Sequence, residues 1–327
     1  MTSSQPLLFV RFPRVNFPNR AGRRFLFAVG VALLAAGTSA GRLVESEPSG
    51  SPGRYQLGDD ELQVDEVFQS HLPSTLSKYA LRFSLHPHLG DWQKKDRMRV
   101  TTAFRYGLTE KCEVSIGSRL YFSHGNGDIR AFDKYGAANL KAGARFDLGE
   151  ALLRGWETGA GFDYEFPTGR PPAEVTDGLR HFRPYVTFSH RCETRPNLRV
   201  FVGFRLDEVE QTDVPGTYAK NSFQESSTGI TGGWVVDRDR WHYTFEASWD
   251  TNRLVGQGSE DIYSLRPGVL YEVPARGKAL VRSNWLVGVS VNSTFGPGGS
   301  SQGASFKIRY SSDIRNRFRR HGDGARR

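Results

Sequence analysis

Residues 97–123 read RMRVTTAFRYGLTEKCEVSIGSRLYFS, and this stretch decides the fold. In both halves, 97–106 and 112–122, apolar side chains alternate with charged or small ones. Successive side chains of a β-strand point to opposite faces, so each half has one apolar and one polar face. Tilted strands of about ten residues span a bilayer. The stretch therefore predicts a hairpin of a transmembrane β-barrel whose apolar face contacts lipid.

The same alternation continues along the chain and gives about twelve strands between residues 79 and 314. Connections between them alternate in length, with short turns such as 107–111 and 274–278 and long loops such as 124–136 and 294–302. Short turns on one side, long loops on the other and an even strand count are typical of outer-membrane barrels. We predict an all-β fold, a transmembrane antiparallel up-and-down β-barrel of about twelve strands. A soluble sandwich or jelly roll is the alternative.

Composition excludes other classes of protein. No apolar run of 18 residues exists, so no helical membrane span is predicted. The net charge of +9 arises at the two ends: residues 1–40 carry five arginines and no acid, and 311–327 carry six arginines and two aspartates. Residues 41–310 are balanced, so the basic pI is no argument for nucleic-acid binding.

The chain divides into four predicted regions. Residues 1–40 hold arginines, the apolar core 25–36 and small residues before a cleavage site after Ala40, as in a signal peptide. Residues 41–77 are predicted to be a flexible N-terminal periplasmic segment, although 61–78 has no clean period and is either a periplasmic arm or a plug of the barrel mouth. Residues 78–314 form the barrel, and 315–327 a basic C-terminal tail.

The predicted inner face is charged. Basic residues gather on the last strand and the first four, which closure makes neighbours, and acids gather on the fifth and ninth strands. The candidate pore-lining residues are Arg82, Arg97, Arg99, Arg105, Arg119, Lys141, Arg145, Glu157, Asp163, Glu165, Glu246, Asp250, Lys307 and Arg309. Facing arcs of opposite charge would set selectivity in an open pore. The alternative is a filled lumen in which these residues form ion pairs.

Proline interrupts two of the predicted strands. Pro184 and Pro267 fall inside strands of a closed barrel that leaves no free edge. Because proline has no N–H to donate, we expect a bulge or a local gap in the hydrogen-bond ladder at each.

Catalytic and metal signals are weak. Ser123 and His124 with Asn126 and Asp128 invite comparison with a lipid-active enzyme, but they open a Gly-rich loop and no oxyanion-hole motif follows. A histidine pair at 86 and 88 is more typical of solvated loop residues than of a metal site. We therefore predict no enzyme, no cofactor and no metal. Cys112 and Cys192 permit at most one disulfide and are read as two separate thiols.

Residues 106–117, YGLTEKCEVSIG, resemble the recurring hairpin of a family of outer-membrane β-barrel transporters that is described through its resemblance to the MetA pathway of phenol degradation. The resemblance is specific over this hairpin and diffuse over 79–310. It implies an outer-membrane barrel that passes small molecules, aromatic or hydrophobic ones among them, and it carries over no substrate residues. The usual barrel chain ends at an aromatic residue that is recognised during assembly. In this chain, Tyr310 and Phe318 both fall on the outward-facing positions, and residues 319–327 follow them, so the C-terminus departs from that pattern.

Taken together, these patterns predict a passive channel or transporter for small solutes in the outer membrane of a Gram-negative-type bacterium. Its expected partners are outer-membrane lipid, small solutes and the barrel assembly machinery, with no nucleic acid. A closed structural or surface-binding barrel without transport is the second hypothesis, and a lipid-active enzyme is the third.

Overall fold

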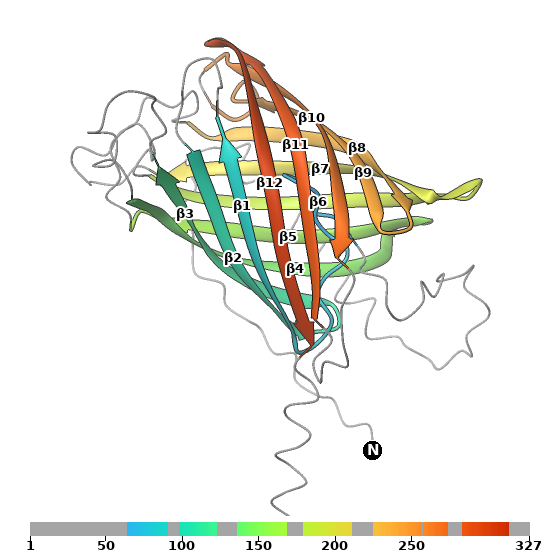
Figure 1. The fold of residues 1–327 in the computed structure, drawn as a ribbon. Coiled ribbons are helices and arrows are strands. Elements are labelled where there is room, and N and C mark those ends of the chain that lie inside the picture. Colours follow the sequence, from blue (N-terminus) through green and yellow to red (C-terminus); the bar gives the residue numbers. More distant parts are fainter. Residues whose placement is uncertain are drawn as a thin grey trace, which may run out of the picture.

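The computed structural model describes residues 64–90, 98–122, 136–168, 179–210, 225–256, 258–273 and 283–313. Within them, twelve antiparallel strands form a closed barrel in which β1 pairs with β12 (Figure 1). The strands are β1 (Ala80–Leu89), β2 (Met98–Thr109), β3 (Cys112–Phe122), β4 (Gly136–Leu153), β5 (Trp156–Phe166), β6 (Arg180–Cys192), β7 (Arg195–Glu210), β8 (Ser227–Arg238), β9 (Trp241–Thr251), β10 (Asp261–Val273), β11 (Ser283–Gly296) and β12 (Gly299–Asp313). The predicted up-and-down fold class is confirmed. Among the described residues, no helix has the length and apolar character needed to cross a bilayer.

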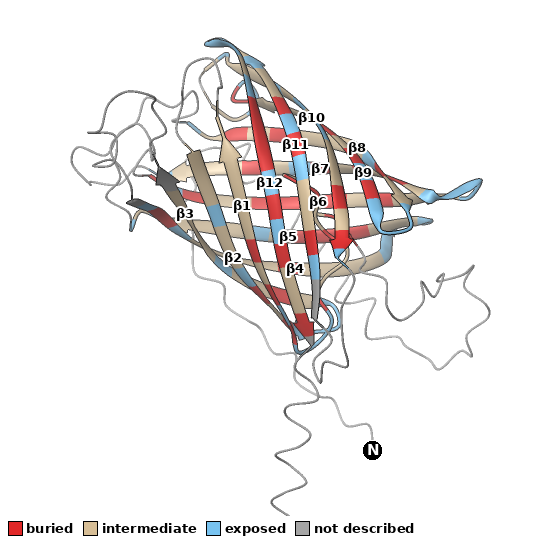
Figure 2. Cartoon of the chain, in the orientation of Figure 1, coloured by how far each residue is buried: buried red, intermediate tan, exposed pale blue. Residues whose placement is uncertain are grey.

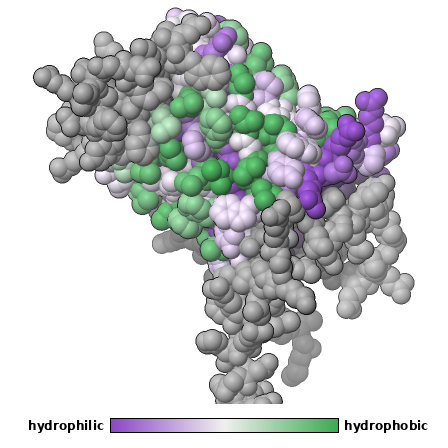
Figure 3. Space-filling view, in the orientation of Figure 1, coloured by the Kyte–Doolittle hydropathy of each residue, from purple (hydrophilic) through white to green (hydrophobic). Residues whose placement is uncertain are grey.

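Alternation along each strand separates two faces, which Figure 2 shows as alternating burial. In the β2–β3 hairpin, Phe104 pairs with Ile116, and both side chains are 50% exposed on the outer surface. The neighbouring Arg105 points inward and is buried. Figure 3 shows apolar side chains spread over the face made by β2, β1, β12 and β11. An apolar exterior around a charged interior is the reverse of a soluble protein and fits contact with hydrocarbon.

Charge on this outer face carries a cost that can be measured. Val289 lies mid-way along β11, between Val269 and Phe306, and is 42% exposed. Replacing it with arginine is expected to lower the free energy of unfolding in lipid vesicles by about 2–4 kcal/mol, as for a charge at mid-bilayer. Leu254→Arg is the control, because Leu254 is exposed in the segment between β9 and β10. Equal stabilities of the two variants would contradict a lipid-facing β11.

Aromatic rings gather near both ends of the barrel. At the end with the β8–β9 turn, Trp241 packs on Tyr271 with ring centroids 4.5 Å apart. At the other end, Trp249 stacks on Tyr263 at 6.5 Å. These two positions agree with the belts that amphipathic rings form at the two membrane interfaces.

Prolines leave gaps in the ladder, as expected. The β6–β7 register omits Pro184 and the residue before it, and the β10–β11 register omits Pro267 and the residue before it. A third gap occurs at Pro87, where β1 pairs with β12. On the opposite edge, Pro184 and Pro267 stay in register with their neighbours. The missing N–H of each proline therefore interrupts the pairing along one edge of its strand only.

One predicted connection differs from the structure. The expected Gly-rich loop 294–302 is mostly strand: β11 and β12 pair up to Gly296 and Gly299, leaving a turn of Pro297 and Gly298. Gly299 has φ +96°, which suits glycine, and this lets the strands run on to a tight hairpin. The expected short turn 274–278 lies outside the described residues.

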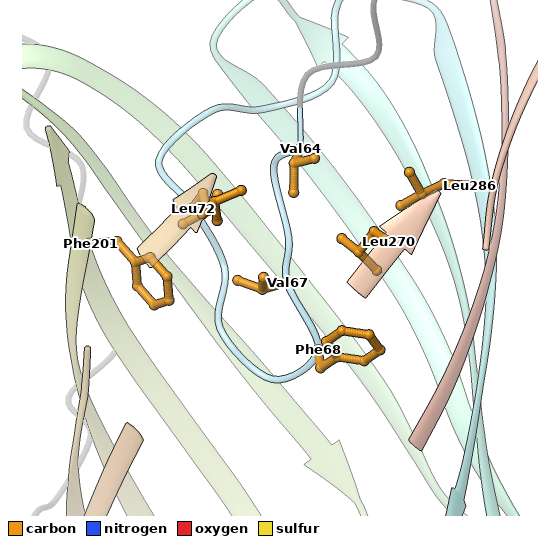
Figure 4. Close-up of a cluster of buried hydrophobic side chains, with 8 residues drawn as sticks. Val64, Val67, Phe68, Leu72, Phe201, Leu270 and Leu286 are labelled. Carbon is orange, nitrogen blue, oxygen red and sulfur yellow. The ribbon is translucent and has the colours of Figure 1, made fainter. Parts of the chain in front are cut away.

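Residues 64–76 lie inside the barrel, which corrects their assignment to a flexible periplasmic segment. Val64, Val67, Phe68 and Leu72 form a buried cluster with barrel side chains (Figure 4). The barrel residues of the cluster are Phe201, Val235, Leu270 and Leu286. Of the two interpretations left open for 61–78, this arrangement corresponds to a plug. The predicted signal peptide 1–40, residues 41–63 and the tail 315–327 lie outside the described residues.

Candidate functional site: a charged lumen and its plug

The plug, residues 64–76, enters and leaves the lumen at the end where the short turns lie. Glu66 and His71 form an isolated antiparallel bridge, so the chain reverses between them. Leu72 donates its N–H to the carbonyl of Asp65 at 2.8 Å, and Val67 donates to that of Ser70 at 3.0 Å. The plug is therefore a short reversal whose tip, residues 67–70, points into the lumen.

Asp65 is the ionic centre of the plug. Its carboxylate contacts the guanidinium groups of Arg82, Arg309 at 2.8 Å and Arg145 at 3.2 Å, and all four side chains are buried. Burial alone would raise the pKa of Asp65, but the three guanidiniums lower it well below its ordinary value. The carboxylate is thus ionised at neutral pH and holds three barrel strands, β1, β4 and β12, to the plug.

Glu66 extends this network around the lumen. Its carboxylate lies 2.8 Å from Arg105 and 3.6 Å from Lys307. Burial would raise the pKa of Glu66, and these two cations lower it well below its usual range. Lys307 also donates to the carbonyls of Glu66, at 3.1 Å, and of Val67. Five predicted lumen cations, those at 82, 105, 145, 307 and 309, therefore bind the plug.

Two barrel carboxylates accept hydrogen bonds from the plug backbone. Glu246 of β9 accepts from the N–H groups of Phe68 at 3.2 Å, Gln69 at 3.1 Å and Ser70 at 2.8 Å. Glu113 of β3 accepts from Leu76 at 2.8 Å. These bonds satisfy N–H groups that the plug does not pair within itself, so they fix its position.

Glycines on the inner face make room for the plug. A Cβ built on Gly268 would lie 2.5 Å from the Phe68 ring, and one on Gly159 would lie 2.6 Å from the Cα of Pro73. Both distances are shorter than side chains tolerate. The close approach of the plug therefore explains why these inward positions of β5 and β10 lack side chains.

Gly268→Ala should loosen the plug. The added methyl overpacks Phe68, and overpacking costs about 1–3 kcal/mol. Amide hydrogen exchange in residues 64–72 should accelerate accordingly, by roughly 5- to 150-fold. Gly232→Ala is the matched control, since its Cβ would meet only the Phe201 carbonyl oxygen, at 3.6 Å. Unchanged exchange in Gly268→Ala would contradict the placement of Phe68.

Beyond the plug tip, the lumen opens into a cavity of about 440 Å³. Its charged lining comes from β2–β5, β7, β10 and β12, together with the plug. A second cavity of about 300 Å³ lies between the tip and β6–β8 and shares Gln69, His71 and Arg205 with the first. Both cavities are large enough for small solutes and are lined by polar groups.

Ion pairs link strands around these cavities. Lys141 lies 2.8 Å from Asp163, and Arg205 lies 2.6 Å from Asp250. Arg183 joins Glu165 at 2.5 Å to Asp207 at 2.7 Å. These pairs couple β4 to β5, β7 to β9 and β5 to β7, and they leave the wall charged but largely compensated.

The predicted site residues fall into three groups. Those that contact the plug are Arg82, Arg105, Arg145, Glu246, Lys307 and Arg309. Those on the first cavity away from the plug contacts are Arg99, Arg119, Lys141, Asp163 and Glu165. Asp250 pairs with Arg205, which lines both cavities, and Glu157 accepts a hydrogen bond from Ser189 at 3.2 Å. Arg97 lies outside the described residues.

Sequence patterns alone did not identify the apolar barrel residues on which the plug packs. Phe201, Val235, Leu270 and Leu286 occupy inward positions near the short-turn end of their strands. Inward apolar residues on four strands were the available signal, because a water-filled lumen would not favour them there.

Other sequence candidates contribute little to this site. The residues of the lipase comparison, 123–128, lie outside the described residues. His88 contacts the Ser305 hydroxyl at 2.7 Å, and Cys112 and Cys192 are both free thiols. Among the described residues, no group of three or more His, Cys, Asp or Glu side chains is arranged to hold a metal ion.

No protein-family model matches this chain, and no curated protein sequence does. Among solved structures, the COG4313 outer membrane channel from Pseudomonas putida F1 is 11% identical with a TM-score of 0.49, over 73% of this chain and 97% of that one. The KdgM porin is 10% identical with a TM-score of 0.43, over 71% and 98%. The CymD monoaromatic hydrocarbon channel is 10% identical with a TM-score of 0.38, over 73% and 89%.

Proposed function

We propose that this protein is a passive channel of the bacterial outer membrane for small polar solutes, with residues 64–76 as a plug in its inner half. The observation that carries the proposal is a closed barrel with an apolar exterior and a polar cavity of about 440 Å³ inside. A barrel that only anchored loops would have no need of an interior cavity. Closure removes every sheet edge, so such a barrel is stable in lipid.

The plug would control passage. At its level the lumen is filled by the apolar cluster of Val64, Val67 and Leu72 against the barrel wall. Solute that enters the outer cavity therefore needs the plug to move before it reaches the other side. Because the plug is one continuous segment held mainly by side-chain contacts, it can leave without breaking any strand pairing of the barrel.

The solutes would be polar rather than purely hydrophobic. Most of the lining of both cavities is charged or hydrogen-bonding, with Phe68 and Tyr185 among the few large rings. Membership of the transporter family that residues 106–117 resemble is part of this proposal, and so are signal-peptide export and contact with the barrel assembly machinery. Aromatic solutes fit if they carry polar groups.

A structural barrel without transport is the second candidate, because ion pairs cross the lumen at many points. Proteoliposome swelling with neutral solutes of graded size separates the two. The channel predicts swelling that falls steeply with solute size and needs no energy source. Swelling no faster than in empty liposomes, both for the full chain and for an Asp65→Asn variant that migrates as a folded barrel, would remove the channel.

A further inference from the structure

The larger cavity has more positive than negative groups on its wall. Eight lysine or arginine side chains line it, against four carboxylates. The cations are Arg99, Arg105, Arg119, Lys141, Arg145, Arg205, Arg266 and Lys307, and the acids are Glu66, Glu113, Asp163 and Glu165. A polar space with this excess of positive charge attracts anions.

The four acids are each engaged by a cation. Glu66 is held by Arg105 and Lys307, and Glu113 by Arg145 at 3.1 Å. The other two also pair, Asp163 with Lys141 and Glu165 with Arg183. Each of these acids is therefore already compensated by a cation at ion-pair distance.

Two guanidiniums lack such a partner within the described part of the chain. Arg266 donates to the neutral amide oxygens of Gln69 at 2.8 Å and Asn292 at 3.2 Å, and its buried Nε has no partner. Arg119 lines both cavities and has no carboxylate within 4 Å among the described residues. The charge of Glu165 reaches Arg119 and that of Glu246 reaches Arg266 only from beyond ion-pair distance, so the donor groups of both guanidiniums have no carboxylate in contact with them among the described residues.

The two guanidiniums lie on nearly opposite walls. Arg119 is on β3 and Arg266 on β10, and the strands β2, β1, β12 and β11 separate them in the ring of twelve. A solute that crosses the cavity therefore passes between them. Guanidinium forks bind carboxylate and phosphate oxygens in pairs, with more geometric specificity than an ammonium group.

We infer that this cavity is a binding site for small organic or inorganic anions that carry a carboxylate or phosphate group, with Arg119 and Arg266 as its recognition residues. This inference rests on the proposed function, because it names the class of solute that the channel favours. Gln69 belongs to the plug tip and orients Arg266. The anion site is thus complete only while the plug is docked.

Calorimetric titration of the full chain in detergent at low ionic strength tests the site, with succinate, inorganic phosphate and the cation choline as probes. Succinate, phosphate or both should bind, and choline should not; the stronger anion identifies the preferred group. Arg119→Gln with Arg266→Gln should weaken anion binding by roughly 10- to 150-fold, as expected for hydrogen bonds to charged groups. Arg238→Gln, at the exposed end of β8, should bind as the unmodified chain does.

The outcomes separate the site from the channel. Absence of anion binding, or equal binding by the double variant, overturns the anion site. The reversal potential in a KCl gradient gives a second readout: the unmodified channel should prefer chloride, and the double variant should lose that preference. Conductance without anion preference overturns the site and leaves the channel standing. Anion binding by a folded barrel that never conducts supports the site and overturns the proposed transport.

Discussion

Asp65→Asn is expected to raise the fraction of barrels with an undocked plug by roughly 10²- to 4 × 10³-fold. The change removes the carboxylate that Arg82, Arg145 and Arg309 share; Arg145 keeps Glu113 at 3.1 Å, and the other two buried guanidiniums lose their ion-pair partner among the described residues. Removing one partner of a buried ion pair costs about 3–5 kcal/mol. Each 1.4 kcal/mol is a factor of about ten in the docking equilibrium.

Amide exchange of residues 64–76, followed by mass spectrometry, measures this effect in the folded barrel. Asp239→Asn is the matched control, because Asp239 lies in the exposed β8–β9 turn with φ +52°, which asparagine tolerates. Heat-dependent gel migration confirms that both variants keep the barrel. Exchange in Asp65→Asn as slow as in the control would show that the plug does not depend on its central ion cluster.

Mild acid is expected to release the plug as well, through His71. Burial, followed by the nearby Arg105 and Arg145, lowers the pKa of His71 to about 3, and Glu66 and Asp163 oppose this only in part. The docked histidine is therefore neutral at pH 5, whereas a released one regains a pKa of about 6.5. Protons bind preferentially to the released state, so docking is fully stable above pH 6.5 and weakens as the pH falls below it.

The expected size of this effect between pH 7.5 and pH 5 is about 2 kcal/mol, or roughly thirty-fold in docking. Asp65 and Glu66, whose pKa values are lowered in the docked state, add to it only below about pH 4. His71→Asn is the informative variant, since its amide oxygen can accept the hydrogen bond that Arg145 donates to Nδ1 at 3.3 Å. Plug exchange should then be insensitive to pH over this range. An equal pH dependence in both proteins would assign the effect to other groups.

The barrel was predictable from sequence because its physical requirement repeats in every strand. Lipid outside and polar groups inside impose the two-residue alternation seen at Phe104 and Arg105, whatever the rest of the chain does. The proline gaps were predictable for the same local reason. The lengths of the connections were harder to predict. Residues 294–302, expected to be a loop, form a tight hairpin because the strand pairing extends to Gly296 and Gly299.

The plug could not be located in this way, because its conformation comes from the lumen around it. Residues 64–76 have no period of their own, and Glu246, which accepts three of their backbone N–H groups, lies 176 to 178 positions along the chain. The charged inner face was recognised as such, and open pore and ion-paired lumen were both consistent with it. The ion-paired arrangement is the one found, because Arg82 and Arg309 both pair with Asp65. Asp65 lies in a segment that has neither strand nor helix periodicity, so this pairing could not be predicted.

The claim that a removable plug closes a solute channel is tested most directly by single-channel recording of the full chain and of a chain lacking residues 64–76, in the same planar bilayers. We predict that the full chain is mostly closed with brief openings, and that the shortened chain gives a steady and larger conductance step. A shortened chain that folds as a barrel and still passes no current, or that matches the full chain in conductance, would contradict it.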